Sequence, residues 1–333
     1  MRILQIIIIF LYLINTNIFA QTQTDKPEQG EGVYQFLKRN GCDVKENYDK
    51  FLELNKGKFG KNNSLLHGVS YVLPNIEDSK KTDKKKGQNE LFGEKYAEYE
   101  IKSNALQGAV LYLSSGHGGP DPGAQGTIDG HTLSEDEYAY DITLRLARRL
   151  LEEGAEVYMI IQDKTDGIRD SSYLSSNKTE TCMGEVIPLS QAKRLQQRTQ
   201  KINELHKKLK PDYARALFVH LDSRNMQQRM DVFYYHFEGA RAGQQLAQTM
   251  SDTFRAKYFE HQPNRQFNGT VSPRKLYVID YSAPVALFAE LGNIQNPFDQ
   301  QRFTIINNRQ AIANWLCAGF IADFENWKKE NKK

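Results

Sequence analysis

Residues 111–126 read L-Y-L-S-S-G-H-G-G-P-D-P-G-A-Q-G, and the rest of the chain is best interpreted from this stretch. An apolar run that ends at Leu113 passes into a loop in which His117 stands among glycines. Glycine permits backbone angles that a Cβ forbids, so the strand can end abruptly and still present one imidazole ring. A histidine at the carboxyl edge of a strand in an open α/β sheet is well placed to bind a metal ion. Taken alone, the pattern also fits a phosphate-binding loop or an ordinary surface histidine.

From residue 92 onward, strand patterns alternate with helix patterns. Short apolar runs predict strands, and apolar residues at helical spacing predict helices. The expected strands are 109–113, 157–161, 216–221, 232–236, 276–279 and 285–289, and the expected helices are 133–151, 189–209, 240–258 and 305–327. This alternation predicts an α/β fold with a largely parallel, twisted sheet flanked by helices.

One long segment interrupts the alternation. Residues 163–188 are polar and have no apolar period. Loops of this length in a compact domain are usually lids, binding loops or disordered segments. We therefore expect the segment to cover or gate a cleft.

The first 20 residues have the composition of an export signal. Arg2 precedes the apolar run 3–14, and the segment ends at the small residue Ala20. The run is shorter than the roughly 20 residues that span a bilayer, which makes a membrane anchor the weaker alternative. We predict a signal peptide over 1–20, a periplasmic or secreted mature protein, and no stable membrane insertion after cleavage.

Charge and cysteine usage limit the other classes of partner. The formal net charge is +3, and basic residues do not alternate with aromatic ones on any element, so we expect no nucleic-acid partner. The three cysteines, Cys42, Cys182 and Cys317, are an odd number in an exported chain, so at least one is unpaired within the monomer.

Residues 29–75 have the pattern of a small βααβ module. The segment begins with G-E-G-V-Y, has two stretches at helical spacing, and ends with L-x-x-G-x-x-Y-x-L-P. It resembles a divergent LysM module, which implies glycan binding; an unspecific helical subdomain is the alternative. Residues 76–91 are lysine-rich and without apolar period, which predicts a solvated linker before a second domain over 92–328.

Three more residues fall on the same edge of the predicted sheet as His117. Glu135 opens the helix after the glycine loop, His220 stands near the end of a buried strand, and Glu290 ends an apolar strand. Each has an ordinary alternative: a first-turn glutamate, a core histidine, or a buried glutamate with a partner. Together, two histidines and one glutamate with a fourth position open to water are typical of catalytic zinc. Glu290 then fits the separate carboxylate that transfers protons.

These segments resemble the zinc-dependent N-acetylmuramoyl-L-alanine amidases of the type 3 family. The matching motifs are G-H-G-G-P-D-P-G-A-Q-G, L-S-E-D-E-Y-A-Y-D-I, F-V-H-L-D and P-V-A-L-F-A-E-L-G-N-I-Q-N, spread over 107–325. The resemblance implies that His117, Glu135 and His220 bind Zn²⁺, with Glu137 as the alternative to Glu135. It also implies that Glu290 is the catalytic acid/base and that the substrate is peptidoglycan, cleaved between N-acetylmuramic acid and L-alanine.

The chain departs from the family pattern at several positions. Ser114 and Ser115 replace the usual Asp-Pro, so a contact behind the ligands is expected to differ. Asp222 replaces an asparagine and Asn293 replaces an aromatic residue, and we expect both to contact the substrate. Two other family positions are expected to shape the fold rather than the chemistry: Arg198 and Asn203.

Two rival functions remain open from the sequence. A zinc peptidase that acts on cell-wall peptides would use the same type of sheet and ligands. A non-catalytic peptidoglycan-binding protein would keep the fold, although all four chemical residues are intact. The sequence specifies no protein activator.

Overall fold

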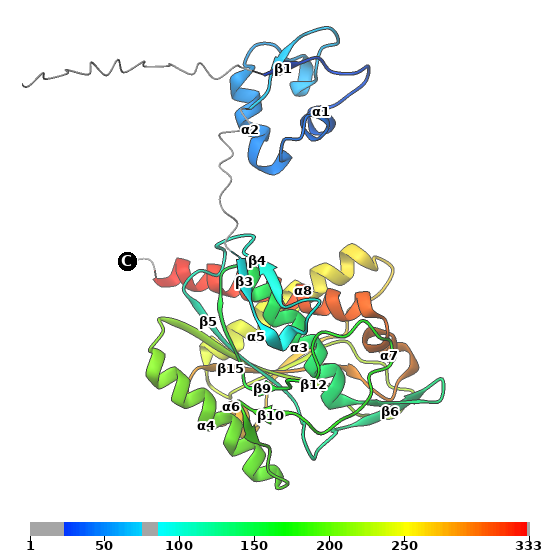
Figure 1. The fold of residues 1–333 in the computed structure, drawn as a ribbon, viewed down its shortest axis with the longest axis vertical. Coiled ribbons are helices and arrows are strands. Elements are labelled where there is room, and N and C mark those ends of the chain that lie inside the picture. Colours follow the sequence, from blue (N-terminus) through cyan, green and yellow to red (C-terminus); the bar gives the residue numbers. More distant parts are fainter. Residues whose placement is uncertain (1–22, 75–85, 332–333) are drawn as a thin grey trace, which may run out of the picture. The chain divides into compact units, whose positions relative to one another are not determined.

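The computed structural model describes residues 23–74 and 86–331, which belong to two units divided between Asp83 and Lys84 (Figure 1). The predicted signal peptide, 1–20, lies outside the described residues, as does the part of the predicted linker over 76–85.

The first unit has a strand–helix–helix–strand order, but its first strand lies before residue 29, where the βααβ module was predicted to begin. Its elements are β1 (Thr24–Asp25), α1 (Val33–Arg39), α2 (Val44–Leu54), the short 3-10 helix η1 (Lys61–Asn63) and β2 (Tyr71–Val72). β1 pairs antiparallel with β2. The buried Asn55 joins α2 to β2, because its amide donates to the Val72 carbonyl and accepts from the Val72 N–H. A small core lies beneath, made of Val33, Phe36, Leu37, Cys42, Phe51, Tyr71 and Leu73.

The second unit is built on a six-stranded sheet with the order β14-β13-β15-β12-β5-β8. Its strands are β5 (Ala109–Ser115), β8 (Glu156–Met159), β12 (Tyr213–Asp222), β13 (Phe233–His236), β14 (Thr270–Pro273) and β15 (Val285–Asn293). β8, β5, β12 and β15 are mutually parallel, whereas β13 runs antiparallel to β15. The predicted largely parallel sheet is therefore confirmed.

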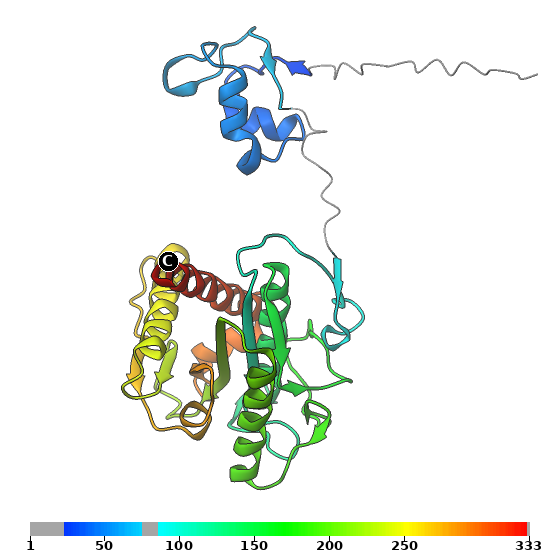
Figure 2. The ribbon, with the colours of Figure 1, turned by 90° about the vertical axis from the view of Figure 1, so that its left-hand side faces the viewer.

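Helices cover both faces of the sheet. They are α3 (Glu135–Glu152), α4 (Gln191–Leu209), α5 (Arg241–His261), α6 (Tyr277–Asp280), α7 (Pro297–Thr304) and α8 (Ile306–Asn331). α3 and α5 pack against strands and against α8. In Figure 2 the strands lie between α5 (yellow) and α4 (green). In Figure 1 the strands likewise lie between α8 and α4.

The predicted strand over 276–279 is wrong, because these residues lie in α6. A four-residue apolar run does not distinguish a strand from a buried helical turn. In the helix, Val278 and Ile279 are buried, while Tyr277 and Tyr281, four residues apart, stack with ring centroids 4.4 Å apart. The edge of the sheet is instead formed by β14.

Two boundaries also differ from the prediction. β3 (Lys86–Gln88) pairs with β4 (Glu98–Glu100), and between them the 3-10 helix η2 (Glu90–Phe92) buries Phe92 completely. The last part of the predicted linker is therefore folded into the second unit. α3 begins at Glu135, because the preceding residues form a hairpin of β6 (Gln125–Ile128) and β7 (His131–Ser134).

Residues 163–188 are ordered, in contrast with the expected irregular loop. β9 (Ile161–Gln162), β10 (Thr181–Cys182) and β11 (Glu185–Val186) form a three-stranded antiparallel sheet. Polar groups anchor the segment, which is why it shows no apolar period. The fully buried Arg309 of α8 donates to the carbonyls of Arg169 and Ser171 and pairs with Asp141 of α3 at 2.7 Å.

Within residues 23–74 and 86–331, no helix combines the length and the apolar content needed to cross a bilayer. Cys42, Cys182 and Cys317 are all buried free thiols, in agreement with the expectation of at least one unpaired cysteine.

Candidate functional site

Two glycines make room for the side chains of the site. β5 ends at Ser115, and His117 follows with a positive φ of 58°. A Cβ on Gly116 would lie 2.4 Å from the ring of His220. A Cβ on Gly123 would lie 2.7 Å from both the His117 ring and the Glu135 carboxylate. The glycines of the motif are therefore required by close approach of side chains as well as by the turn.

The structure brings together His117, Glu135 and His220, from the loop after β5, the first residue of α3, and β12. One ligand atom from each lies within 4.8 Å of the others. His117 Nε2 is 3.1 Å from Glu135 Oε2, and His220 Nδ1 is 2.8 Å from Glu135 Oε1. Glu137, the sequence alternative, points elsewhere and pairs with Arg169 at 2.7 Å.

The carboxylates around His117 stabilise a positive charge at this histidine. Burial lowers the pKa of His117, but hydrogen bonds to Asp121 and Glu135 outweigh it and raise the pKa to about 10. Burial raises the pKa of Glu135, but both histidines outweigh it and hold the pKa well below its usual value. Burial also lowers the pKa of His220, which favours its neutral, metal-binding form. Two imidazoles and one ionised carboxylate are a donor set that fits zinc.

Side chains behind the cluster fix the orientation of His117. Asp121 Oδ2 lies 2.9 Å from His117 Nδ1 and accepts from Arg194 at 2.6 Å. The hydrogen bond to His117 holds the pKa of Asp121 at about 2, despite partial burial. The buried Arg198 donates to the His117 carbonyl. Such carboxylate–histidine pairs set the tautomer and the ring orientation of metal ligands.

Sequence reasoning missed Asp121 and Arg194 as supporting residues. A carboxylate four residues after a loop histidine was a usable signal for the first. Arg194 is 73 residues away from Asp121, and nothing in a single sequence pairs them. Asn203 has the fold-shaping role that was expected: its amide bonds to the Tyr281 carbonyl and to the Ala283 N–H, which ties α4 to the segment after α6.

Within the described part of the chain, no hydrogen bond joins Ser114 or Ser115 to the side chains of His117, Glu135 or His220. Ser114 Oγ donates to the Ser115 carbonyl, and Ser115 Oγ is buried without a hydrogen-bond partner. Both line a cavity of about 250 Å³ that lies beside His117 and His220 and is bordered by α4 and α6.

Glu290 lies directly beside His220 in the sheet, because the two residues are Cα partners in the parallel register of β12 and β15. Phe288, two residues earlier, stacks on His220 with ring centroids 4.2 Å apart. Glu290 is 9% exposed, and its Oε2 has no hydrogen-bond partner among residues 23–74 and 86–331. Burial, with the Glu135 and Asp222 carboxylates, raises the pKa of Glu290 to about 8. A buried carboxyl group with a free oxygen next to the cluster is available to exchange protons.

The two expected substrate contacts have different surroundings. Asp222 is partly exposed at the end of β12, where its Oδ2 accepts from Arg224 at 2.6 Å. Asn293 is fully buried, so the expected substrate contact does not fit its placement. Its Nδ2 donates to the carbonyls of Asn225 and Gln228, and it thereby holds the loop that joins β12 to β13.

The register between β12 and β15 changes next to Asn293. The register of β12 and β15 shifts between His220 and Asp222, so Asp222 pairs with Asn293 although three positions separate Asn293 from Glu290. Gly292, with a φ of 142°, supplies the irregular backbone. A bulge of this kind changes the face on which the next side chain lies.

A second buried acidic cluster consists of Asp136, Glu137 and Glu180. Glu180 Oε2 accepts from the Gly119 N–H at 2.8 Å and so connects the 163–188 segment to the loop of His117. Burial and the neighbouring carboxylates raise the pKa of Asp136 to about 8. This carboxyl group is thus favoured in its neutral form at pH 7, which limits the repulsion inside the cluster.

A family model described as N-acetylmuramoyl-L-alanine amidase matches residues 111–322, a range that contains His117, Glu135, His220 and Glu290. The chain belongs to this amidase family. A germination-specific N-acetylmuramoyl-L-alanine amidase of Bacillus subtilis (strain 168) is 24% identical over 223 residues, which cover 66% of this chain and 81% of that protein.

Several solved structures are similar to this chain at low sequence identity. Cwp6 from Clostridium difficile aligns with a TM-score of 0.47 and 20% identity, and the match covers 65% of this chain but only 29% of Cwp6. AmiC2 of Nostoc punctiforme gives 0.45 and 18%, with 67% and 99% coverage. The CwlD amidase from Clostridioides difficile, solved in complex with the GerS lipoprotein, gives 0.48 and 17%, with 65% and 98% coverage.

Proposed function

We propose that this chain hydrolyses the amide bond between N-acetylmuramic acid and L-alanine in peptidoglycan. In this proposal His117, Glu135 and His220 bind Zn²⁺ and Glu290 is the acid/base. The supporting observation is the buried, unpartnered Oε2 of Glu290 beside a cluster of two histidines and one glutamate. Family membership supports the same reaction class.

The residues present fit a zinc ion. The three donors come from different elements, converge within 4.8 Å and are oriented by Asp121 and Arg198. Zinc held in this way would supply a Lewis acid for the amide carbonyl and a water of lowered pKa.

The chain's own groups account for the proton transfers. Glu290, in the ionised fraction that its pKa of about 8 leaves near neutral pH, accepts a proton as water adds to the carbonyl carbon. It then donates this proton to the leaving nitrogen as the C–N bond breaks. The products are a lactyl carboxylate on the sugar and a free amine on the peptide. Phe288 keeps His220 in place by stacking, and the limited exposure of Glu290 keeps bulk water away from the exchanged proton.

Digestion of purified peptidoglycan by the mature protein, with and without a chelator, tests the proposal through the masses of the products. Free peptides with an N-terminal alanine and intact glycan lactyl groups are expected, and the chelator should stop their release. Shortened stem peptides would instead identify a peptidase. No cleavage with stoichiometric zinc bound would identify a non-catalytic wall-binding protein.

We further propose that residues 1–20 direct export and that residues 29–75 bind wall glycan in the manner of a LysM module. The βααβ order of the first unit supports the second proposal. A peptidoglycan pull-down with residues 21–90 tests it. The fragment should sediment with peptidoglycan if it binds glycan, and it should remain in the supernatant if it does not. The N-terminal residue of the exported protein tests cleavage after Ala20.

A further inference from the structure

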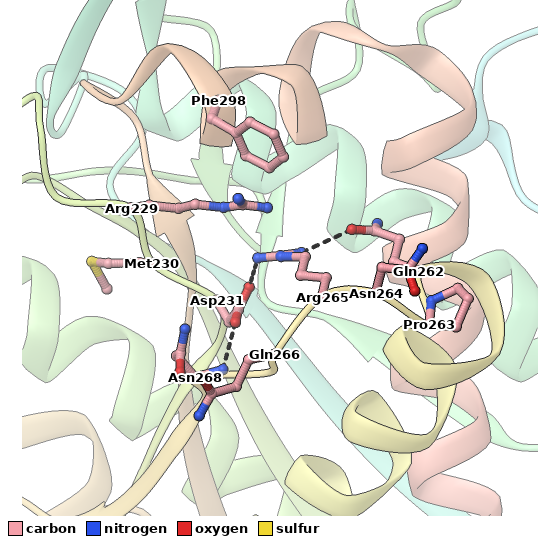
Figure 3. Close-up of a pocket in the computed structure, with 10 residues that line it drawn as sticks. All are labelled: Arg229, Met230, Asp231, Gln262, Pro263, Asn264, Arg265, Gln266, Asn268 and Phe298. Atoms are coloured by element: carbon pink, nitrogen blue, oxygen red, sulfur yellow. Dashed lines mark hydrogen bonds and ion pairs between the residues drawn. The ribbon is translucent and has the colours of Figure 1, made fainter.

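A second cavity, of about 570 Å³, lies at the start of β13, between the loop 223–232, the segment after α5 and the first turn of α7. Its volume is within the usual range of small-ligand pockets. Figure 3 shows its lining: Arg229 lies between the ring of Phe298 and Arg265, and Gln262, Asn264 and Gln266 come from the segment after α5. None of these residues belongs to the cluster around His117.

Asp231 lines this cavity, and both of its carboxylate oxygens already accept hydrogen bonds. Asp231 is 1% exposed, and its Oδ1 accepts from Arg302 at 2.9 Å and also from Arg265. Its Oδ2 accepts from the Asn268 N–H at 2.6 Å. Asp231 therefore compensates Arg265 and Arg302 and has no free oxygen for a third cation.

Arg229, in contrast with Arg265, has no carboxylate partner in the described part of the chain. Its guanidinium lies 3.2 Å from the ring centroid of Phe298, and no ion pair to it is found among residues 23–74 and 86–331. Phe298 is itself 44% exposed, so the stacked pair is open to a ligand. Burial and the charges of Arg265 and Arg302 lower the pKa of Arg229 more than the carboxylates of Asp231 and Asp299 raise it, so an anion here would relieve repulsion.

The pairing of β13 with β15 brings this cavity near Glu290. Arg229 stands four residues before Phe233, and Phe233 is the Cα partner of Glu290 across β13 and β15. The four residues from Arg229 to Phe233 span at most about 14 Å. An extended substrate peptide of about four residues can reach equally far. Asn293 holds Gln228, the neighbour of Arg229, through its buried amide.

We infer that this cavity binds the C-terminal carboxylate of the substrate's peptide, with the Arg229 guanidinium as the recognition group. The inference rests on the proposed function. Cleavage at the N-terminal amide of a peptide leaves the rest of that peptide extending from Glu290, and it ends in a carboxylate. The planar guanidinium matches a carboxylate in a bidentate manner, and stacking on Phe298 fixes its plane. A neutral sugar ring carries no charge that would pair with the Arg229 guanidinium, so a carboxylate is the better ligand for this cavity.

The test measures binding instead of turnover, so it does not depend on catalysis. Two probes are compared: an N-acetylmuramoyl tetrapeptide with a free C-terminal carboxylate, and the same molecule with a C-terminal amide. Both are titrated calorimetrically into full-length Glu290→Gln protein, with and without Arg229→Gln. The carboxylate probe should bind more tightly than the amide, and Arg229→Gln should weaken it about 10- to 100-fold and remove the difference between the two probes.

Arg241→Gln is the matched control, because Arg241 is exposed on α5 and does not line the cavity. It should leave both affinities unchanged. Equal binding of the two probes, or equal weakening of both by Arg229→Gln, would overturn the inference. Competition by inorganic phosphate that equals the carboxylate probe would also overturn it, since it would assign the cavity to a phosphate-bearing wall polymer. Failure of the proposed function alone would appear as absent cleavage by wild-type protein with carboxylate-selective binding intact.

Discussion

Gly116 and His220 approach each other so closely that a Cβ at residue 116 would lie 2.4 Å from the imidazole ring. Gly116→Ala should therefore displace His220 from Glu135 without removing any ligand. We expect metal affinity to fall by more than about tenfold, as when the groups that orient a ligand are lost. Competition with a chelator of known zinc affinity measures the change.

Gly243→Ala is the matched control for this variant. The nearest atom to a Cβ there is 3.5 Å away, an ordinary contact, and alanine favours the interior of α5 by about 1 kcal/mol. Wild-type zinc affinity in Gly116→Ala would show that the loop shifts freely, and that the glycine serves only the turn.

The proximity of His117, Glu135, His220 and Glu290 was predictable because parallel strands end at one edge of a sheet. His117 follows β5, while His220 and Glu290 lie near the carboxyl ends of β12 and β15. The three strands are adjacent and parallel, so these positions in the sequence already place the residues together. Glu135 enters the same edge because α3 begins immediately after the loop hairpin. These residues needed only the strand pattern and the motif spacing.

Other features depend on information that local patterns do not contain. The buried pair of Asp141 and Arg309 joins residues 168 apart, and it anchors the 163–188 segment by contacts that no periodicity reports. The substrate contact expected of Asn293 does not fit its burial, and the register shift beside Gly292 that positions this residue is not visible in local patterns.

Glu290→Gln should separate proton transfer from metal binding. The amide keeps the shape of the carboxylate but cannot exchange a proton, so kcat should fall by about 10²- to 10⁴-fold. Zinc content should stay at the wild-type level, since the three donors are untouched. Glu238→Gln, a change at an exposed residue, is the control and should keep full activity. Retained turnover in Glu290→Gln would exclude this residue as the acid/base.

Asp121→Asn should weaken zinc binding although Asp121 is not among the three donors. The carboxylate accepts from both His117 and Arg194, and its loss frees the His117 ring to rotate. We expect about 10- to 100-fold lower zinc affinity, measured by chelator competition. Asp129→Asn removes a carboxylate that pairs with the Tyr173 hydroxyl instead, and it should have no such effect. Unchanged affinity in Asp121→Asn would show that Arg198 alone positions the loop.

Acid should destabilise the first unit through Glu31. The hydrogen bond from Arg39 holds the pKa of Glu31 below its ordinary value of 4.5. Because the folded-state pKa is the lower one, the unfolded chain binds more protons in this range. The stabilisation is therefore fully present above about pH 4.5 and is lost as the pH falls through the folded-state pKa. Hydrogen exchange of residues 33–54 in the full-length protein should show protection that declines below this pH.

Glu31→Gln should remove that decline, because the amide does not titrate, and it should lower the protection at pH 7. Glu53→Gln, an exposed change on α2, should keep the wild-type profile. Arg39 also pairs with Asp25 at 2.8 Å, so a small acid dependence is expected to remain in Glu31→Gln. An acid profile identical to that of the wild type in Glu31→Gln would mean that another carboxylate controls the unfolding of this unit.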